Sequence, residues 1–275
     1  MMWTTQLRSK SSKNITYYRR GSGLPLILIH GVGLKLESWN AQIQYLKKYF
    51  DVIAIDLPGH GESEILESRD INIDLYSEAI KSFTDEIIQK KFIIMGHSLG
   101  ALIALDYIKK YKDDCYGLIA LNCIYQRDNE AMNALKNRLK NSFSENFDKE
   151  VDTTIKRWFG EGESTENIEL TKYCRSWLLN SNKTGYRSAY KVFANYKGVP
   201  KKLLMENILP SYFITGSQDK NSTPDMSRKM NELCENGNTL IVEGAGHMAQ
   251  MSHFSQVNDA ILTFALEIEN WRNNT

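Results

Sequence analysis

The feature that most constrains the fold is a serine flanked by glycines where an apolar run meets a helical pattern. Residues 92–95 form a short apolar run, and apolar residues recur at roughly helical spacing after residue 100. The intervening GHSLG (residues 96–100) fits the pattern Gly-x-Ser-x-Gly. Small flanking residues permit a turn sharp enough to hold the hydroxyl of Ser98 exposed at the start of a helix. The stretch predicts either a nucleophile or a simple tight turn, and the presence of partner residues decides between them.

The remainder of the chain predicts an α/β fold on a mostly parallel sheet. PLILIH (residues 25–30) and DVIAID (residues 51–56) are predominantly apolar, which is typical of strands buried on both faces. Segments with helical periodicity separate such runs, and this alternation implies right-handed crossovers between parallel strands. The expected strands cover residues 3–8, 14–20, 25–30, 51–56, 92–95, 116–122, 209–216 and 238–244. The expected helices of this pattern cover residues 38–49 with Ser38 as N-cap, 74–89, a segment from Leu99, 224–235 and 255–271.

The middle of the chain differs, because no run typical of a buried strand occurs between residues 124 and 204. Helical patterns rich in aromatic residues lie there instead, near 129–144, 149–159, 168–179 and 185–196. We therefore expect one core domain, made of residues 1–123 and 205–275, interrupted by a helical cap at 124–204. The cap is expected to sit as a lid over Ser98, with Trp158 and Trp177 as candidates for lining a substrate pocket.

Composition excludes several classes of partner. The formal net charge is +1, no dense run of Lys or Arg occurs, and no stretch is long and apolar enough to span a membrane. The N-terminus lacks the apolar core of a signal peptide, and the four cysteines are scattered without a metal-binding or disulfide pattern. We expect a cytoplasmic monomer or homodimer that acts on a small molecule and binds neither nucleic acid nor membrane.

A nucleophilic serine needs a base, and the best-placed histidine is His247. It lies in the loop EGAGHMAQMSH, after the last expected strand and before the last helix, at the edge where a parallel sheet gathers its chemistry. His253 is the main rival. The side chain of His97, next to the serine, is expected to point away from it, and His30 and His60 are expected to brace loops.

The base in turn needs a carboxylate, which is expected between the serine and the histidine in the chain. Asp219 lies in a turn after the strand that precedes His247. The alternatives are that Asp219 is only a turn residue and that Asp225, in the first turn of the next helix, supplies the acid.

An acyl-transfer site also needs N–H donors for the oxyanion of the tetrahedral intermediate. The residue after the nucleophile, Leu99, is expected to provide one. The glycine-rich HGVG (residues 30–33) is expected to provide the other through Val32, with Gly31 or Gly33 as alternatives.

The motifs HGVG, DLPGHGES, GHSLG, TGSQD and GAGH follow one another in the order found in the α/β-hydrolase family, and the sequence strongly resembles that family over nearly its whole length. The resemblance implies a mostly parallel central sheet flanked by helices, with an inserted helical cap and neither metal nor organic cofactor. It is nearest to capped esterases, enol-lactonases and carbon–carbon bond hydrolases. Met248 and Met251 stand near His247, where the carbon–carbon hydrolases usually have tryptophan.

These observations predict hydrolysis of a small carboxylic ester or lactone through an acyl-enzyme on Ser98, with His247 and Asp219 as its partners. The alternatives are carbon–carbon bond hydrolysis of a vinylogous diketone and a ligand receptor on a hydrolase scaffold. We also place Gly31, His97 and Met248 in the substrate pocket. Three arginines are candidates for holding a substrate carboxylate: Arg127, Arg157 and Arg175.

Overall fold

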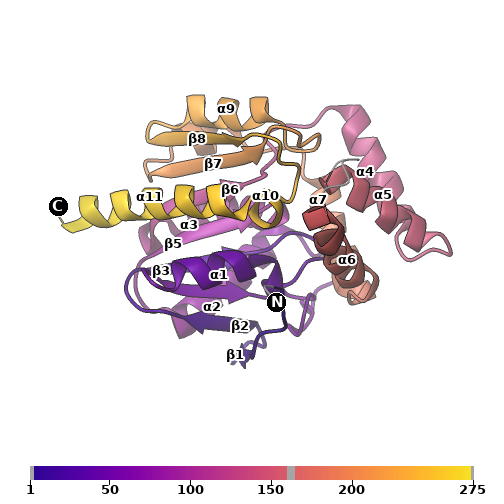
Figure 1. The fold of residues 1–275 in the computed structure, drawn as a ribbon, viewed down its shortest axis with the longest axis horizontal. Coiled ribbons are helices and arrows are strands. Elements are labelled where there is room, and N and C mark those ends of the chain that lie inside the picture. Colours follow the sequence, from indigo (N-terminus) through magenta and orange to yellow (C-terminus); the bar gives the residue numbers. More distant parts are fainter. Residues whose placement is uncertain (1–2, 160–164, 274–275) are drawn as a thin grey trace.

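The structure, a computed structural model, describes residues 3–159 and 165–273. Within these residues, eight strands form one sheet in the order β1-β2-β4-β3-β5-β6-β7-β8 (Figure 1). Neighbouring strands from β4 to β8 are parallel, whereas β2 is antiparallel to both β1 and β4. The mostly parallel sheet expected from the sequence is therefore confirmed. The strands are β1 (Ser9–Lys10), β2 (Thr16–Arg20), β3 (Pro25–Ile29), β4 (Asp51–Ile55), β5 (Phe92–His97), β6 (Cys115–Leu121), β7 (Ser211–Gly216) and β8 (Gly237–Val242).

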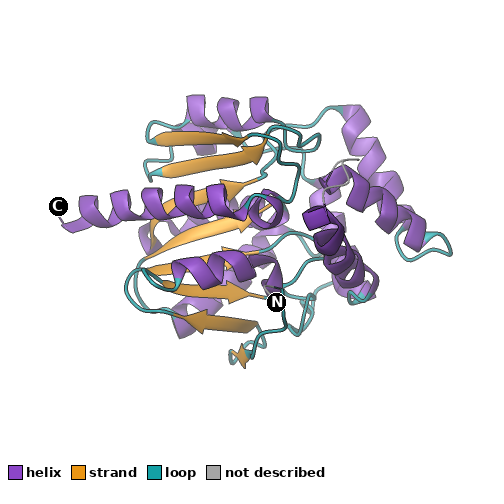
Figure 2. Cartoon of the chain, in the orientation of Figure 1, coloured by secondary structure: helices purple, strands orange, loops and turns teal. Residues whose placement is uncertain are grey.

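Helices cover both faces of the sheet. Helices α1 (Asn40–Leu46) and α11 (Phe254–Asn273) contact each other on one face, and α2 (Ile73–Ile87) and α3 (Leu99–Tyr111) contact each other on the opposite face (Figure 2). Helix α9 (Pro224–Leu233) packs against β7 and β8. Three short helices complete the core: η1 (Leu36–Trp39), η2 (Lys112–Asp114) and α10 (Ala249–Ser252).

Alternate residues of the central strands enter two different hydrophobic clusters. In β3, Leu26 and Leu28 belong to the cluster under α1 and α11, while Ile27 and Ile29 belong to the cluster under α2 and α3. Full burial of each such side chain contributes roughly 1.5–3 kcal/mol relative to leaving it exposed. Burial on both sides explains why these strands are continuously apolar in the sequence.

The N-terminal segment differs from the sequence prediction. The strand expected at residues 3–8 does not form, and only Ser9–Lys10 pairs with β2. The backbone N–H of Gln6 instead donates to the Glu37 carboxylate, and the Arg8 side chain lies in a buried ion-pair network. Ser38 was also wrong as a cap, because it lies inside η1 and α1 begins at Asn40.

Between β6 and β7 the described residues form five helices joined by loops. We call these elements the inserted helices: α4 (Asn129–Asn141), α5 (Phe147–Phe159), α6 (Thr165–Leu179), α7 (Lys183–Asn195) and α8 (Lys201–Met205). Helices α4 to α7 lie beyond the carboxyl ends of the parallel strands, at the right of Figure 1. Residues 160–164 of the expected cap lie outside the described residues. No helix of the described chain is long and apolar enough to cross a membrane.

Candidate active site

Ser98 occupies a strained turn between β5 and α3. Its backbone has φ 55° and ψ −115°, in a region that residues other than glycine rarely adopt. A Cβ at Gly96 would overlap the carbonyl of Gly100, and a Cβ at Gly100 would overlap the carbonyl of Ile29. The two glycines therefore permit the close approach that this turn requires, and the serine remains on the wall of a cavity.

The structure brings His247 and Asp219 together. His247 Nδ1 lies 2.7 Å from Asp219 Oδ2, and both side chains are buried. Burial alone would raise the pKa of Asp219, but the facing His247 and the donors Asn122 and the Asn221 N–H outweigh it and lower that pKa to about 2. The ionised carboxylate accepts the Nδ1 proton, so the lone pair of the neutral imidazole lies on Nε2.

The rival acid and base from the sequence lie elsewhere. The carboxylate of Asp225 is exposed and pairs with Arg228 at 2.8 Å. His253 Nδ1 shares a hydrogen bond with the Ser252 hydroxyl at 2.9 Å. Neither Asp225 nor His253 lines the cavity that contains Ser98 and His247.

His97 links the turn at Ser98 to the loop that carries His247. Its Nε2 lies 2.8 Å from the backbone carbonyl of His247. Burial, with the neighbouring His247 as a smaller cause, lowers the pKa of His97 to about 3, so this imidazole is neutral and Nε2–H donates. His97 also lines the cavity.

The glycine-rich loop after β3 lies directly against the serine. A Cβ added at Gly31 would lie 3.1 Å from Ser98 Cβ and 3.0 Å from His97 Nδ1, so little room separates them. Gly31 and Val32 both line the cavity. Leu99 is the first residue of α3, and its N–H has no acceptor within the helix. The expected oxyanion donors thus lie on the two segments that meet at Ser98.

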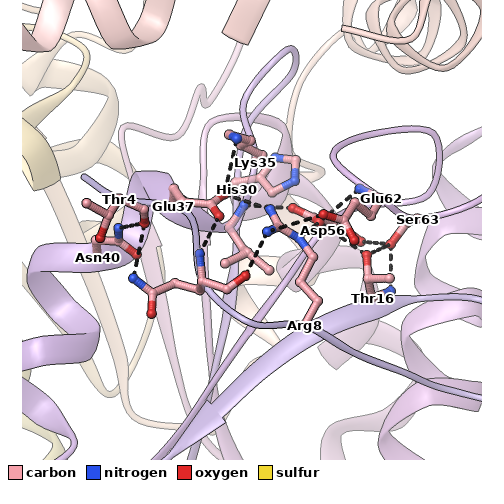
Figure 3. A network of polar contacts seen from close by, with 12 residues as sticks. Thr4, Arg8, Thr16, His30, Lys35, Glu37, Asn40, Asp56, Glu62 and Ser63 are labelled. Atoms are coloured by element: carbon pink, nitrogen blue, oxygen red, sulfur yellow. Dashed lines mark hydrogen bonds and ion pairs between the residues drawn. The ribbon is translucent and has the colours of Figure 1, made fainter. Parts of the chain in front are cut away.

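His30, which begins the glycine-rich loop, lies beside a network of polar contacts (Figure 3). His30 Nε2 accepts the N–H of Leu57 at 3.0 Å, and its Nδ1 lies 2.7 Å from the carbonyl of Gly31. Burial, more than any charge, lowers the pKa of His30, so Nδ1–H donates from a neutral ring. The sequence expectation that His30 braces a loop agrees with these contacts.

Arg8 extends this network to the N-terminal segment. Its guanidinium pairs with Asp56 at 2.8 Å and with Glu37 at 2.7 Å, and Asp56 also accepts the N–H of Leu36 at 2.8 Å (Figure 3). Burial would raise the pKa of Asp56, but Arg8 and the other donors together lower it. The start of η1 is therefore tied to Arg8 of the N-terminal segment and to Asp56, which follows β4.

Ser98 and His247 face a cavity of about 410 Å³ under the inserted helices. Among the described residues that line it, four are cationic (Arg127, Arg138, Arg157 and Lys220) and one, Asp128, is acidic. Asp128 caps α4 by accepting the N–H of Ala131. The cavity is therefore suited to an anionic small molecule.

The three arginines have no carboxylate partner among the described residues. Arg127 donates to the carbonyls of Phe193 and Tyr196 at 2.6 and 3.1 Å, and burial lowers its pKa to about 10. Burial also lowers the pKa of Arg157, whose Nε has no hydrogen-bond partner in the described chain. A buried cation without a counter-ion is costly, so a bound carboxylate would compensate for it.

Three residues placed near the substrate by sequence reasoning lie elsewhere. Trp177 lies beneath Lys35, whose Nζ is 5.8 Å from the ring centroid, and lines a separate depression. Met248 is fully buried in the hydrophobic core and does not line the cavity. Arg175 pairs with Asp152 at 2.7 Å outside the cavity. By contrast, Gly31, His97 and Trp158 do line it.

Sequence reasoning missed the cavity-lining cations Arg138 and Lys220 and the amide of Asn122. Arg138 lines the cavity from α4, but nothing in a helical pattern distinguishes it from a solvated arginine. Asn122 donates to Asp219 at 2.8 Å. Its place at the carboxyl end of β6, beside β7, was a signal that could have identified it.

Comparison with known proteins defines the class. A family model described as alpha/beta hydrolase fold matches residues 25–254. The chain belongs to the α/β-hydrolase fold family, as its sequence motifs predicted.

Particular relatives narrow the comparison. The chain is 31% identical over 264 residues to (E)-2-((N-methylformamido)methylene)succinate hydrolase of Acinetobacter baylyi, covering 94% of this chain and 97% of that protein. A thermophilic esterase from Thermogutta terrifontis matches with a TM-score of 0.86 at 22% identity, covering 96% of this chain and 99% of that one. The enol-lactonase from Burkholderia xenovorans matches with a TM-score of 0.83 at 18% identity, covering 92% and 96%. At these identities the two structures establish the fold alone.

Proposed function

We propose that this protein is a serine hydrolase that cleaves a small acyl substrate bearing one or more carboxylates, through an acyl-enzyme on Ser98. One observation carries the proposal. Ser98 and His247, which is paired with Asp219, share a cavity with three arginines that have no carboxylate partner in the described chain. The proposed nucleophile and the arginines therefore face the same small cavity. One substrate molecule can place its carbonyl group at Ser98 and its carboxylate at the arginines.

The reaction follows from the proposed roles of these groups. His247 Nε2 takes the proton of the Ser98 hydroxyl as the oxygen attacks the acyl carbonyl. The N–H groups of Val32 and Leu99 bind the oxyanion, and His247 then protonates the leaving group. A water activated by His247 releases the acid in the second half. Asp219 holds the reactive tautomer and stabilises the imidazolium.

The full-length relative supports the anionic substrate class. Its name describes a substituted succinate, which carries two carboxylates, together with a formamido group. We therefore propose a substituted succinate or a related half-ester or lactone as the substrate of this chain. Hydrolysis of an amide of such an acid is the second candidate, favoured by the same relative.

The inserted helices are proposed to act as a cap that recognises the carboxylates. Arg138 comes from α4 and Arg157 from α5, and Trp158 follows directly in the chain. Burial inside the cavity strengthens each charge-assisted hydrogen bond. A cytoplasmic location, and a monomer or homodimer, remain predictions from the sequence.

A matched pair of substrates tests the proposed class. 4-Nitrophenyl hemisuccinate carries a free carboxylate, and its methyl ester differs only in that this carboxylate is esterified and therefore uncharged. Purified protein is expected to hydrolyse the hemisuccinate with the higher kcat/KM. A hydrogen bond to a charged group contributes about 1.5–3 kcal/mol, so Arg157→Gln should lower kcat/KM for the hemisuccinate by roughly 10- to 150-fold and spare the methyl ester.

Arg175→Gln provides the matched control, because Arg175 is paired outside the cavity. Equal kcat/KM for both esters in all three proteins would contradict the anionic substrate class. An unsaturated amide of succinate and a carboxylated dienol diketone extend the panel. Turnover of the diketone alone would replace the proposal with carbon–carbon bond hydrolysis.

A further inference from the structure

The C-terminal end of inserted helix α5 contacts the backbone of the proposed base. The N–H of His247 donates to the carbonyl of Trp158 at 2.8 Å. Trp158 is the penultimate residue of α5, and the last four carbonyls of a helix have no partner within it. The loop that carries His247 therefore donates a hydrogen bond to one carbonyl in the last turn of α5.

Gly246 shows how closely the two segments approach. A Cβ at this position would overlap the Trp158 carbonyl oxygen, a backbone atom that cannot move aside as a side chain can. Gly246 does not have a positive φ, so close approach and not backbone conformation accounts for the glycine. The Trp158 ring also lies against the His247 imidazole, with centroids 6.0 Å apart and planes 33° from parallel.

His247 is thus held at three points from three parts of the chain. Asp219 holds its Nδ1 at 2.7 Å, and His97 holds its backbone carbonyl at 2.8 Å. Both of these groups belong to the core. The third point, the backbone N–H, is held by an inserted helix.

We propose that Trp158 is a positioning residue for His247, so that docking of α5 places the base as well as covering the cavity. The inference rests on the proposed function, since it assumes that His247 is the base. Arg157 precedes Trp158 and lines the cavity, so a substrate carboxylate bound by Arg157 also secures the end of α5. The partial negative charge of the helix C-terminus favours the imidazolium that forms during catalysis.

This arrangement makes a specific prediction about which substrates depend on α5. If the inserted helices only bind the carboxylate, disturbing the contact lowers activity on charged substrates alone. If α5 positions the base, the chemical step suffers for every substrate, because a misplacement of about 1 Å can cost about 100-fold.

Gly246→Ala tests the proposal by forcing the Trp158 carbonyl away. We expect kcat to fall by roughly 10- to 100-fold for both 4-nitrophenyl hemisuccinate and its methyl ester, with little change in KM for the methyl ester. Arg157→Gln should lower activity on the hemisuccinate only. Unchanged kcat for the methyl ester in a folded Gly246→Ala protein would overturn the proposal.

Gly117→Ala is the matched control. Gly117 is a buried glycine without positive φ in β6, where an added Cβ would meet the Ile268 side chain of α11. It is expected to lower thermal stability but to leave kcat near the wild-type value. A comparable loss of kcat in both glycine variants would mean that the loss in Gly246→Ala comes from general destabilisation of the protein. That result would overturn the proposal.

Amide hydrogen exchange of the wild-type protein provides a second test that needs no variant to fold. The His247 amide is expected to be protected, and more strongly so with saturating succinate. Arg157→Gln should abolish the increase. An unprotected His247 amide, or one that succinate leaves unchanged, would contradict the inference. Absence of turnover by wild type on every substrate would instead refute the proposed function, and the exchange result would still report on the contact.

Discussion

At the scale of single residues, the site depends on a few positions whose identity has a direct physical cause. Ser98 has a backbone conformation that is strained for any residue other than glycine. The two glycines of GHSLG allow β3, α3 and the turn at Ser98 to pack closely together. Strain of this kind costs about 1–3 kcal/mol and persists only where the surroundings enforce it. The GHSLG pattern was therefore readable in the sequence, because sterics limit which residues can form such a turn.

The two candidate acids give a residue-scale prediction. Asp219→Asn should lower kcat by about four orders of magnitude, because an amide no longer enforces the Nδ1–H tautomer of His247. Asp225→Asn is the matched control, since that carboxylate is exposed and its one ion-pair partner among the described residues is Arg228. Steady-state kinetics of both variants decides the assignment. Retained activity in Asp219→Asn, or an equal loss in Asp225→Asn, would show that the acid is misassigned.

At the scale of elements, the core strands were predictable and the N-terminal segment was not. Runs such as residues 25–30 are apolar because β3 is buried on both faces. Residues 3–8 also suited a strand, yet Arg8 is drawn into an ion pair with Glu37 and Asp56. Those partners are 29 and 48 residues away in the chain. A pattern of hydrophobic and polar residues within a short segment cannot predict contacts over such a separation.

The same network predicts how the N-terminal segment supports the fold. Arg8→Met should leave Asp56 buried without its cation and Glu37 with Lys35 alone, at 3.7 Å, and breaking a buried pair in this way costs about 3–5 kcal/mol. The midpoint of urea denaturation should fall accordingly. Arg228→Met, which removes an exposed pair with Asp225, should change stability by about 0–1 kcal/mol. Equal midpoints for the two variants would contradict the structural role of the network.

At the scale of the whole molecule, the order of the motifs along the chain was enough to predict that they meet at one place in the fold. The same order did not predict which residues of the inserted helices line the cavity. Parallel strands place GHSLG, Asp219 and His247 at one sheet edge, so their spacing along the chain was sufficient. The inserted helices offered no comparable rule. Helical periodicity did not reveal that Arg138 faces the cavity while Trp177 lies beneath Lys35, since that depends on how the helices dock.

Buried neutral histidines predict the acid sensitivity of the molecule. Burial, and secondarily a neighbouring imidazole, lowers the pKa of both His60 and His97 from 6.5 to about 3. Between these values the unfolded chain binds more protons, so the free energy of unfolding falls as pH drops from about 6.5 towards 3. Each such histidine contributes about 1.4 kcal/mol per pH unit to this slope.

His60→Gln isolates one of these contributions, because His60 is not part of the proposed machinery. Urea denaturation across this pH window should give a shallower slope for the variant than for wild type. Identical slopes would mean that His60 does not remain neutral in the folded protein.

If Ser98 is the nucleophile, its replacement by alanine removes the oxygen that forms the acyl-enzyme. Turnover of 4-nitrophenyl hemisuccinate would be compared between wild type and Ser98→Ala, with folding of both verified by their thermal unfolding. We expect kcat to fall by about three orders of magnitude or more. A Ser98→Ala protein that hydrolyses the ester near the wild-type rate would contradict it.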